Sequence, residues 1–183
     1  MDLTSTALIV VDVQAGFDEP GWGPRNNPAC EGNIAALISA WREASRPIVF
    51  VRHDSVTEGS PLQPGRPGNA FKDVVHGEPD LLVAKNVNSA FFGEPDLHGW
   101  LHDRGVTGVA IAGIQTNYCC ETTARMAGNL GYETLFVIDA THTFDLPAYG
   151  GGTITADELA RVTATNLQEE FAAVVTTAEL LGS

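Results

Sequence analysis

The chain has few cysteines, few basic residues and no long apolar run. Its 3 cysteines are an odd, low number, which argues against a disulfide framework and favours a reducing compartment. No apolar segment approaches the roughly 18 residues that a membrane-spanning helix needs. The N-terminus shows no basic region followed by an apolar segment and a cleavage site. We therefore expect a cytoplasmic protein with no membrane partner.

Basic residues are outnumbered, with 10 Lys and Arg against 23 Asp and Glu, which gives a net charge of −13. Such a surface repels nucleic acid, so we expect no nucleic-acid partner. It would suit a cationic small molecule, although acidity can also simply keep a protein soluble. The hydrophobic content of 44% and the length of 183 residues fit one globular domain spanning residues 1–183.

Two common nucleotide-binding signatures are also missing. The first predicted strand runs into DVQAGF rather than a Gly-rich turn, and no GxxxxGK[ST] sequence occurs. An open α/β sheet still binds its ligand outside the carboxyl ends of its strands. The reactive residues at those ends are therefore the candidates for a functional site.

Strand patterns alternate with helical patterns along the chain. Apolar runs predict strands at residues 6–14, 47–53, 81–85, 107–113, 133–140 and 172–176, and helical periodicity predicts helices at residues 31–44, 96–104, 116–130 and 155–171. This alternation predicts the α/β class, with an open, mostly parallel six-stranded sheet and helices on both faces. The stretch 54–79, rich in Gly and Pro, is too long for an idle connection and is expected to be a lid or interface segment.

The stretch AIAGIQTNYCCETTA reads as a strand, a sharp turn and a helix with two cysteines in its first turn. Unpaired N–H groups and the helix dipole favour an anion at that position, so a cysteine there is pushed towards thiolate. We expect one of the two, Cys119 rather than Cys120, to be a nucleophile. Buried cysteine is often only apolar filler, and this stretch alone leaves the two interpretations about even.

Other reactive residues stand at the ends of the predicted strands. Asp12 ends the first strand, Lys85 ends the third, and Cys119 follows the fourth. A parallel sheet brings these strand ends to one edge. A carboxylate beside a thiol can take its proton, and a nearby lysine keeps both groups ionised. Singly, Asp12 could cap a backbone and Lys85 could be a solvated strand end, but together they favour an active site.

Three motifs in this order, ALIVVDVQAGF, KNVNSAFFG and GIQTNYCCETTA, resemble the isochorismatase-like cysteine hydrolase superfamily, which includes nicotinamidases and N-carbamoylsarcosine amidohydrolases. The resemblance implies a Rossmann-like fold with an Asp12, Lys85 and Cys119 triad and a homodimer or larger assembly. It also implies a cis peptide at Ile114–Gln115 and an oxyanion hole made by the backbone N–H groups of Gln115 and Cys119. The register selects Cys119, because neighbouring helix residues point about 100° apart.

The segment RHDSVTEGSPLQPGRPGNAFK resembles streptothricin hydrolase-type amide hydrolases more narrowly. One departure concerns metal. Nicotinamidases build a zinc site from an Asp-x-His pair and a further His, whereas the second strand here ends in Arg52, His53 and Asp54. We therefore expect no catalytic metal and no cofactor, and we doubt nicotinamidase activity.

Several aromatic and histidine side chains are candidates for the pocket. His53 and His142 are expected either to contact substrate or to serve the structure. The aromatic residues expected to form pocket walls, although such residues more often pack on the core, are Phe17, Trp22, Phe91, Tyr118 and Tyr149.

The resulting functional hypothesis is hydrolysis of a C–N amide or lactam bond through a thioester on Cys119. The substrate would be a small-molecule amide that could be cationic. The alternatives are a vinyl ether hydrolase of the isochorismatase type, a non-catalytic protein that binds a small molecule, and a redox-sensing thiol protein that uses Cys119 and Cys120.

Overall fold

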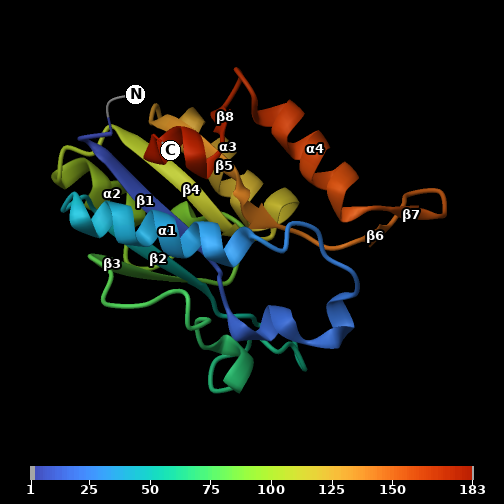
Figure 1. Cartoon of the computed structure of the whole chain (residues 1–183). Coiled ribbons are helices and arrows are strands. Elements are labelled where there is room, and N and C mark those ends of the chain that lie inside the picture. The colour runs from blue at the N-terminus through green and yellow to red at the C-terminus, as the bar shows by residue number, and fades with distance from the viewer. Residues whose placement is uncertain (1–2, 183) are drawn as a thin grey trace.

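The computed structural model describes residues 3–182, and a six-stranded sheet runs through its middle (Figure 1). The sheet order is β3-β2-β1-β4-β5-β8, and every neighbouring pair is parallel. The strands are β1 (Thr6–Val11), β2 (Ile48–His53), β3 (Leu81–Lys85), β4 (Gly108–Ile114), β5 (Glu133–His142) and β8 (Ala173–Val175). The predicted α/β class with a mostly parallel six-stranded sheet is confirmed.

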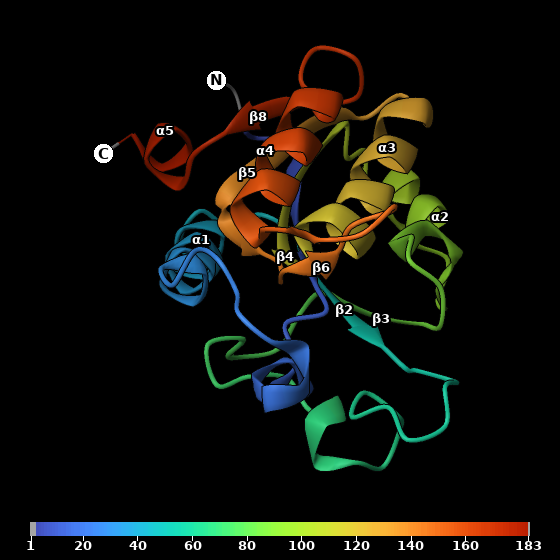
Figure 2. The ribbon, with the colours of Figure 1, turned by 90° about the vertical axis from the view of Figure 1, so that its right-hand side faces the viewer.

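Helices cover both faces of this sheet (Figure 2). One face carries α1 (Cys30–Glu43) and the short α5 (Thr177–Leu181), and the other carries α2 (Leu97–Asp103), α3 (Glu121–Asn129) and α4 (Ala156–Leu167). A two-stranded hairpin, β6 (Leu146–Pro147) and β7 (Thr153–Ile154), precedes α4. Within residues 3–182, no helix combines the length and the apolar character needed to cross a bilayer.

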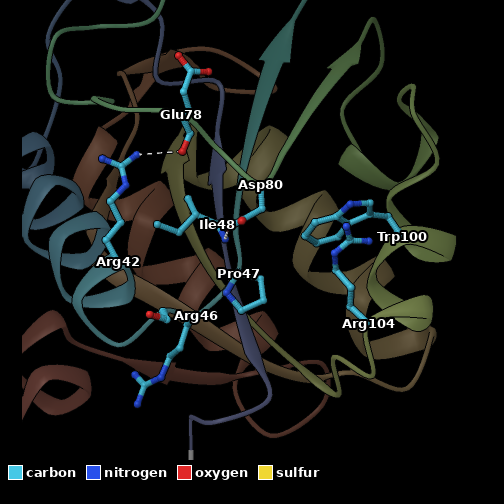
Figure 3. Close-up of a pocket in the computed structure, with 9 residues that line it drawn as sticks. Arg42, Arg46, Pro47, Ile48, Glu78, Asp80, Trp100 and Arg104 are labelled. Atoms are coloured by element: carbon cyan, nitrogen blue, oxygen red, sulfur yellow. Dashed lines mark hydrogen bonds between the residues drawn. The ribbon is translucent and has the colours of Figure 1, made fainter.

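A hollow of about 300 Å³ opens at the N-terminal edge of β2 and β3 (Figure 3). Its polar groups already serve the fold. Arg42 donates to the Glu78 carbonyl oxygen at 3.3 Å, and Asp80 accepts the N–H of Ile48 at 2.8 Å. The Arg104 guanidinium lies 4.1 Å from the centroid of the Trp100 ring. These contacts tie the end of α1 and the start of β2 to the chain that leads into β3, and they order the end of α2.

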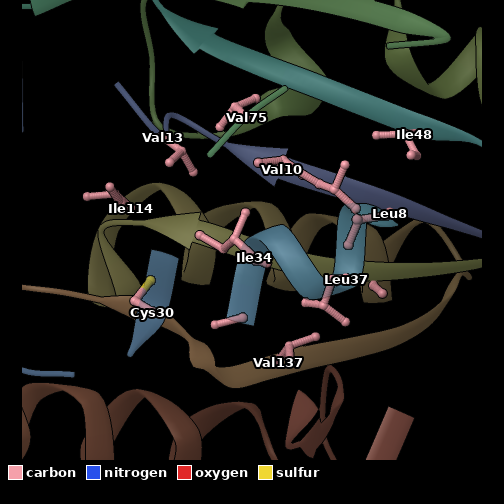
Figure 4. Packing of buried hydrophobic residues seen from close by; sticks show 14 of the residues in the cluster. Leu8, Val10, Val13, Cys30, Ile34, Leu37, Ile48, Val75, Ile114 and Val137 are labelled. Atoms are coloured by element: carbon pink, nitrogen blue, oxygen red, sulfur yellow. The ribbon is translucent and has the colours of Figure 1, made fainter. Parts of the chain in front are cut away.

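The core beneath α1 shows why β1 is apolar along its whole length (Figure 4). Leu8 and Val10 point to α1 and pack with Ile34 and Leu37, while Ile9 belongs to the cluster on the other face of the sheet. A strand buried on both faces reads as a continuous hydrophobic run. Each fully buried aliphatic side chain stabilises the fold by about 1.5–3 kcal/mol. A well-packed core therefore holds the strands in place up to their ends.

Some predicted boundaries differ from the structure. The predicted helix 116–130 begins with a π-helical turn at Thr116–Cys120, and only Glu121–Asn129 is α-helical. Strand β5 continues to His142, two residues beyond its predicted end, because its last residues still pair with β4. The β6–β7 hairpin was not predicted, since its two-residue strands are too short to show alternation.

Candidate active site

The strand order brings four chemically reactive residues to one edge of the sheet. Lys85 is the last residue of β3, His53 is the last of β2, and Asp12 directly follows β1. Cys119 lies in the turn after β4, the strand on the other side of β1. The register pairs His53 with Lys85, so the C-terminal ends of these strands are level with one another.

Backbone geometry around Asp12 is unusual. Its φ angle is +52°, in the left-handed region, while its N–H donates to the Val51 carbonyl oxygen at 2.8 Å. Opposite β1, Gly113 has a φ of +139°, and a Cβ at Gly113 would overlap the carbonyl oxygen of Val11. Only glycine therefore lets β4 approach β1 this closely beside the site.

The turn that carries Cys119 is fixed from two directions. The Ile114–Gln115 peptide is cis, and the N–H groups of Tyr118 and Cys120 both donate to the Gln115 carbonyl oxygen. Thr116 Oγ1 donates to Thr141 Oγ1 at 2.9 Å, which anchors the turn to the end of β5.

The two adjacent cysteines face different surroundings. Cys119 lines a cavity and keeps 8% of its surface exposed, whereas Cys120 is fully buried in the core beside α3. Neighbouring residues on a helical turn point in different directions, so only one of them can reach the cavity. The structure gives that place to Cys119.

Lys85 sits at the centre of the cluster. Its Nζ lies 2.6 Å from Asp12 Oδ2, 3.2 Å from His53 Nδ1 and 3.4 Å from Cys119 Sγ. The side chains of Lys85 and Asp12 are both fully buried. The second carboxylate oxygen, Asp12 Oδ1, is buried with no hydrogen-bond partner among residues 3–182. A buried carboxylate oxygen without a donor is free to accept a proton.

Burial dominates the electrostatics of the site. It raises the pKa of the Cys119 thiol to about 12, with the Asp12 charge adding to the rise and Lys85 opposing it. Burial also raises the pKa of Asp12, against the lowering effect of Lys85. For Lys85, burial lowers the pKa, but the charges of Asp12 and Cys119 outweigh it and the net pKa is raised.

These shifts correct one expectation from the sequence. The position at the start of a helix was expected to push Cys119 towards thiolate, whereas burial raises the pKa of its thiol because desolvation exceeds the favourable contribution of Lys85. Asp12 becomes a stronger base as its pKa rises, and Lys85 stays an ammonium. The cluster therefore holds a proton that can pass between sulfur and carboxylate beside a fixed positive charge.

The same cluster contains a possible set of metal ligands. One ligand atom each from Asp12, His53 and Cys119 lies within 4.8 Å of the others. The Lys85 ammonium, however, contacts all three groups. A metal ion there would meet this positive charge and would have to displace it. The donor set therefore fits an ammonium-centred cluster and does not fit a metal site.

A cavity of about 280 Å³ opens over Cys119. Its residues are Asp12, Phe17, Trp22, His53, Leu62, Asn88, Gln115, Tyr118 and Cys119. Phe17 packs on Trp22 with ring centroids 4.9 Å apart, and Trp22 packs on Phe144 at 5.5 Å, which makes one wall aromatic. Four of the expected pocket residues, Phe17, Trp22, His53 and Tyr118, therefore do line the cavity.

The structure places three other expected pocket residues elsewhere. Phe91 stacks on Tyr132 at 5.9 Å in the core on the α3 side, because its 3₁₀ turn directs the ring away from the cavity. His142 is fully buried inside the extended β5, where burial lowers its pKa to about 3. Tyr149 is fully exposed beyond β6. None of these three side chains lines this cavity, which corrects the pocket-wall expectation for Phe91 and Tyr149 and favours the structural alternative for His142.

Sequence reasoning missed several polar residues around His53. Gln14 Oε1 accepts the His53 N–H at 2.9 Å, and Gln14 Nε2 donates to the His53 carbonyl oxygen at 3.1 Å. Asn69 Nδ2 donates to that same oxygen at 3.2 Å. Gln14, the last residue of the predicted first strand and two residues beyond Asp12, could have been flagged by its place at the active edge. Asn69 and the cavity residue Leu62 lie in the stretch 54–79, where no periodicity marks them.

Comparison with known proteins adds family evidence to this geometry. The sequence model of the Isochorismatase domain matches residues 6–179. YrdC, an uncharacterized isochorismatase family protein of Bacillus subtilis, is 36% identical over 176 residues, which cover 96% of this chain and 94% of YrdC. Nicotinamidase 3 of Arabidopsis thaliana is 33% identical, covering 92% of this chain and 83% of its own length.

Streptothricin hydrolase of Streptomyces noursei is 32% identical over 148 residues, which cover 79% of this chain and 57% of that protein. A solved structure of an isochorismatase family protein from Chromobacterium violaceum is similar over 100% of this chain and 94% of its own, at a TM-score of 0.94 and 37% identity. The resemblance drawn from the three sequence motifs is thus confirmed. The chain belongs to the isochorismatase family.

Proposed function

We propose that the protein hydrolyses a C–N amide bond of a small molecule, with Cys119 as nucleophile. The observation that carries this proposal is the meeting of Asp12, Lys85 and Cys119 beside the cavity, which Asp12 and Cys119 line. Support also comes from two relatives named for the hydrolysis of nicotinamide and of streptothricin. A vinyl ether has no carbonyl carbon for the sulfur to attack, so that alternative leaves Cys119 without a role.

Acylation begins with the proton on Cys119. As the sulfur attacks the substrate carbonyl carbon, the thiol proton passes to Asp12, whose raised pKa suits it to accept. Lys85 contacts both groups and stabilises the negative charge on whichever group carries it. The backbone N–H groups of Gln115 and Cys119 are proposed to bind the tetrahedral oxyanion. Asp12 then gives its proton to the leaving nitrogen, the C–N bond breaks and a thioester remains.

Deacylation uses the same groups in reverse. Asp12 takes a proton from a water molecule that attacks the thioester carbonyl carbon. The C–S bond breaks, the carboxylic acid leaves, and the proton on Asp12 returns to the Cys119 sulfur. The proton count is restored after each turnover, and the proposed steps call on no cofactor.

The cavity bounds the substrate. Its volume of about 280 Å³ admits a small amide, and its charged lining residue, Asp12, is already paired with Lys85. Among the residues that line the cavity, no unpaired carboxylate is therefore left to bind a cationic substrate. We propose a small, uncharged amide with a flat or apolar body that packs on Phe17, Trp22 and Tyr118.

The adjacent cysteines supply a matched test. Purified wild type, Cys119→Ala and Cys120→Ala proteins are incubated with a panel of amides, lactams and isochorismate, and products are measured by mass spectrometry. We expect Cys119→Ala to lose roughly 10⁴-fold or more in kcat/KM on an amide. Cys120→Ala should stay within about tenfold, since it only removes a buried sulfur. Amide hydrolysis that survives in Cys119→Ala would refute the proposal.

A further inference from the structure

The contacts of Lys85 account for every proton on its ammonium group. An ammonium has three N–H donors and no acceptor. The structure provides three partners at hydrogen-bond distance, namely Asp12 Oδ2, His53 Nδ1 and Cys119 Sγ. Two of these belong to the proposed reaction. The third, His53, has no part in the mechanism above.

The charge on Lys85 decides how His53 holds its proton. Because Lys85 can only donate, Nδ1 of His53 must accept, and the ring proton of the neutral imidazole then sits on Nε2. A second proton on the ring would place an N–H against the ammonium. Burial and the Lys85 charge both lower the pKa of His53, which is consistent with a neutral ring.

The backbone of His53 is clamped. Gln14 bonds both its N–H and its carbonyl oxygen, and Asn69 bonds the carbonyl oxygen as well. Both amides are buried. Gln14 and Asn69 in turn connect, because Gln14 Nε2 donates to the Asn69 carbonyl oxygen at 2.9 Å. The ring of His53 is therefore held between Lys85 and the cavity that it lines.

We propose that His53 is a positioning and specificity residue that acts through both ring nitrogens. Nδ1 accepts the third N–H of Lys85 and holds the ammonium against Asp12 and Cys119. The Nε2–H that this leaves donates to a hydrogen-bond acceptor on the substrate. The inference rests on the proposed amide hydrolysis and narrows its substrate to a small amide that carries a second hydrogen-bond acceptor, apart from the amide group itself. Because His53 lines the cavity, an analogue without an acceptor at this position would lose the hydrogen bond to Nε2–H and bind more weakly.

Substitution of His53 by asparagine or by glutamine tests the roles of its two ring nitrogens separately. In His53→Asn the side-chain oxygen stands as many bonds from Cα as Nδ1 does, so it keeps the acceptor for Lys85 and loses the donor. In His53→Gln the amide nitrogen stands as far out as Nε2, so it keeps the donor and loses the acceptor. His53→Leu loses both. The control is His102→Asn, because the side chain of His102 is 80% exposed on α2.

The first readout is the rate at which iodoacetamide alkylates Cys119, followed by peptide mass spectrometry. It needs no substrate and reports how well Lys85 is held beside the sulfur. We expect His53→Gln and His53→Leu to slow alkylation at least about fivefold, because a displaced ammonium no longer stabilises the thiolate. His53→Asn and His102→Asn should stay within about twofold of wild type. Equal rates in all the variants would overturn the role of Nδ1.

The second readout is protection of Cys119 from alkylation by benzamide and by the three pyridinecarboxamides, which differ from benzamide by one ring nitrogen. We expect one pyridine isomer to protect wild type and His53→Gln at about a tenfold lower concentration than benzamide. His53→Asn should lose this preference. If all four amides protect equally, or none does, the role of Nε2–H is overturned.

The two proposals fail differently. If the His53 variants match wild type in alkylation rate and in amide protection while Cys119→Ala is inactive, this inference is refuted and the proposed function stands. Hydrolysis that persists in Cys119→Ala would refute the proposed function, and the alkylation rates would still decide whether His53 positions Lys85.

Discussion

The sheet has a hollow at each end, and the two are nearly equal in size but opposite in chemistry. The hollow at the N-terminal edge measures about 300 Å³ and the cavity over Cys119 about 280 Å³. At the first, Arg42 and Asp80 bond backbone groups and Arg104 stacks on an aromatic ring. At the second, fully buried Asp12 and Lys85 bond each other beside a thiol.

The difference shows what marks a functional site in this fold. Volume does not separate the two hollows, and neither does the presence of charged residues. The distinguishing feature is that charge at the C-terminal edge is desolvated and shared among ionisable side chains, which shifts their pKa values. At the N-terminal edge the charges bond the backbone or stack on a ring, so they hold the fold together.

The difference between the two ends can be tested by removing a charge at each of them, beginning with Lys85→Met. We expect a roughly 10³–10⁴-fold loss of kcat/KM on an amide, because the proton transfer loses its fixed positive charge. The free energy of unfolding in urea should fall by about 3–5 kcal/mol, since Asp12 becomes an unpaired buried carboxylate.

The control for that loss is the double variant Asp12→Asn with Lys85→Met. It should regain much of the stability, because no unpaired charge is left, while staying inactive. A Lys85→Met protein with wild-type turnover would remove the reason for treating the two ends differently.

A second effect, of intermediate size, is expected in the pH dependence of the rate at which Cys119 is alkylated. With its pKa raised to about 12, the folded thiol binds a proton that a free thiol has already lost at pH 9–11. Alkylation of Cys119 by iodoacetamide should therefore keep rising about tenfold per pH unit above pH 9. The urea-unfolded protein should instead level off near pH 9. A plateau near pH 8.5 in the folded protein would mean that the thiol is not desolvated.

The same raised pKa makes stability fall at alkaline pH, because the folded state holds the proton more tightly than the unfolded chain does. The free energy of unfolding should therefore decrease as pH rises from about 9 towards about 12. Cys119→Ser, which does not ionise in this range, should weaken that dependence by about one proton. An unchanged slope would assign the alkaline loss to other groups.

The smallest effect is expected at the other end of the sheet. Arg104→Ala removes a cation–π contact with Trp100 and should cost about 0.5–1 kcal/mol in the free energy of unfolding. Amide hydrolysis should stay within about twofold of wild type, because the residue acts only on local packing. A large loss of activity would show that the N-terminal hollow takes part in function.

The sheet and the candidate residues at its edge could be predicted from the same signal, the apolar runs that mark buried strands. Strands buried on both faces are legible as apolar runs, and Asp12 and Lys85 stand where those runs stop. The residues that the sequence did not reveal lie in segments without regular secondary structure, whose path depends on the tertiary fold. Asn69 reaches His53 only because the stretch 54–79 wraps over the cavity, and no local pattern encodes that path.

The errors have a common cause as well. The helix position and Lys85 were expected to push Cys119 towards thiolate, but the depth of burial that raises its pKa comes from tertiary packing. His142 fell outside the strand predicted at residues 133–140, whereas pairing with β4 keeps it in the sheet. Local sequence thus identified the candidate residues, and three-dimensional packing shifts their pKa values.

The central claim is that the Cys119 sulfur carries the acyl group during turnover. The most direct measurement uses p-nitrophenyl acetate, an activated acyl donor, with acid quenching and peptide mass spectrometry at successive times. We expect a burst of p-nitrophenol together with one acetyl group on the peptide containing Cys119, and neither in Cys119→Ala. An acetyl group mapped to a different residue, or a burst that persists in Cys119→Ala, would contradict it.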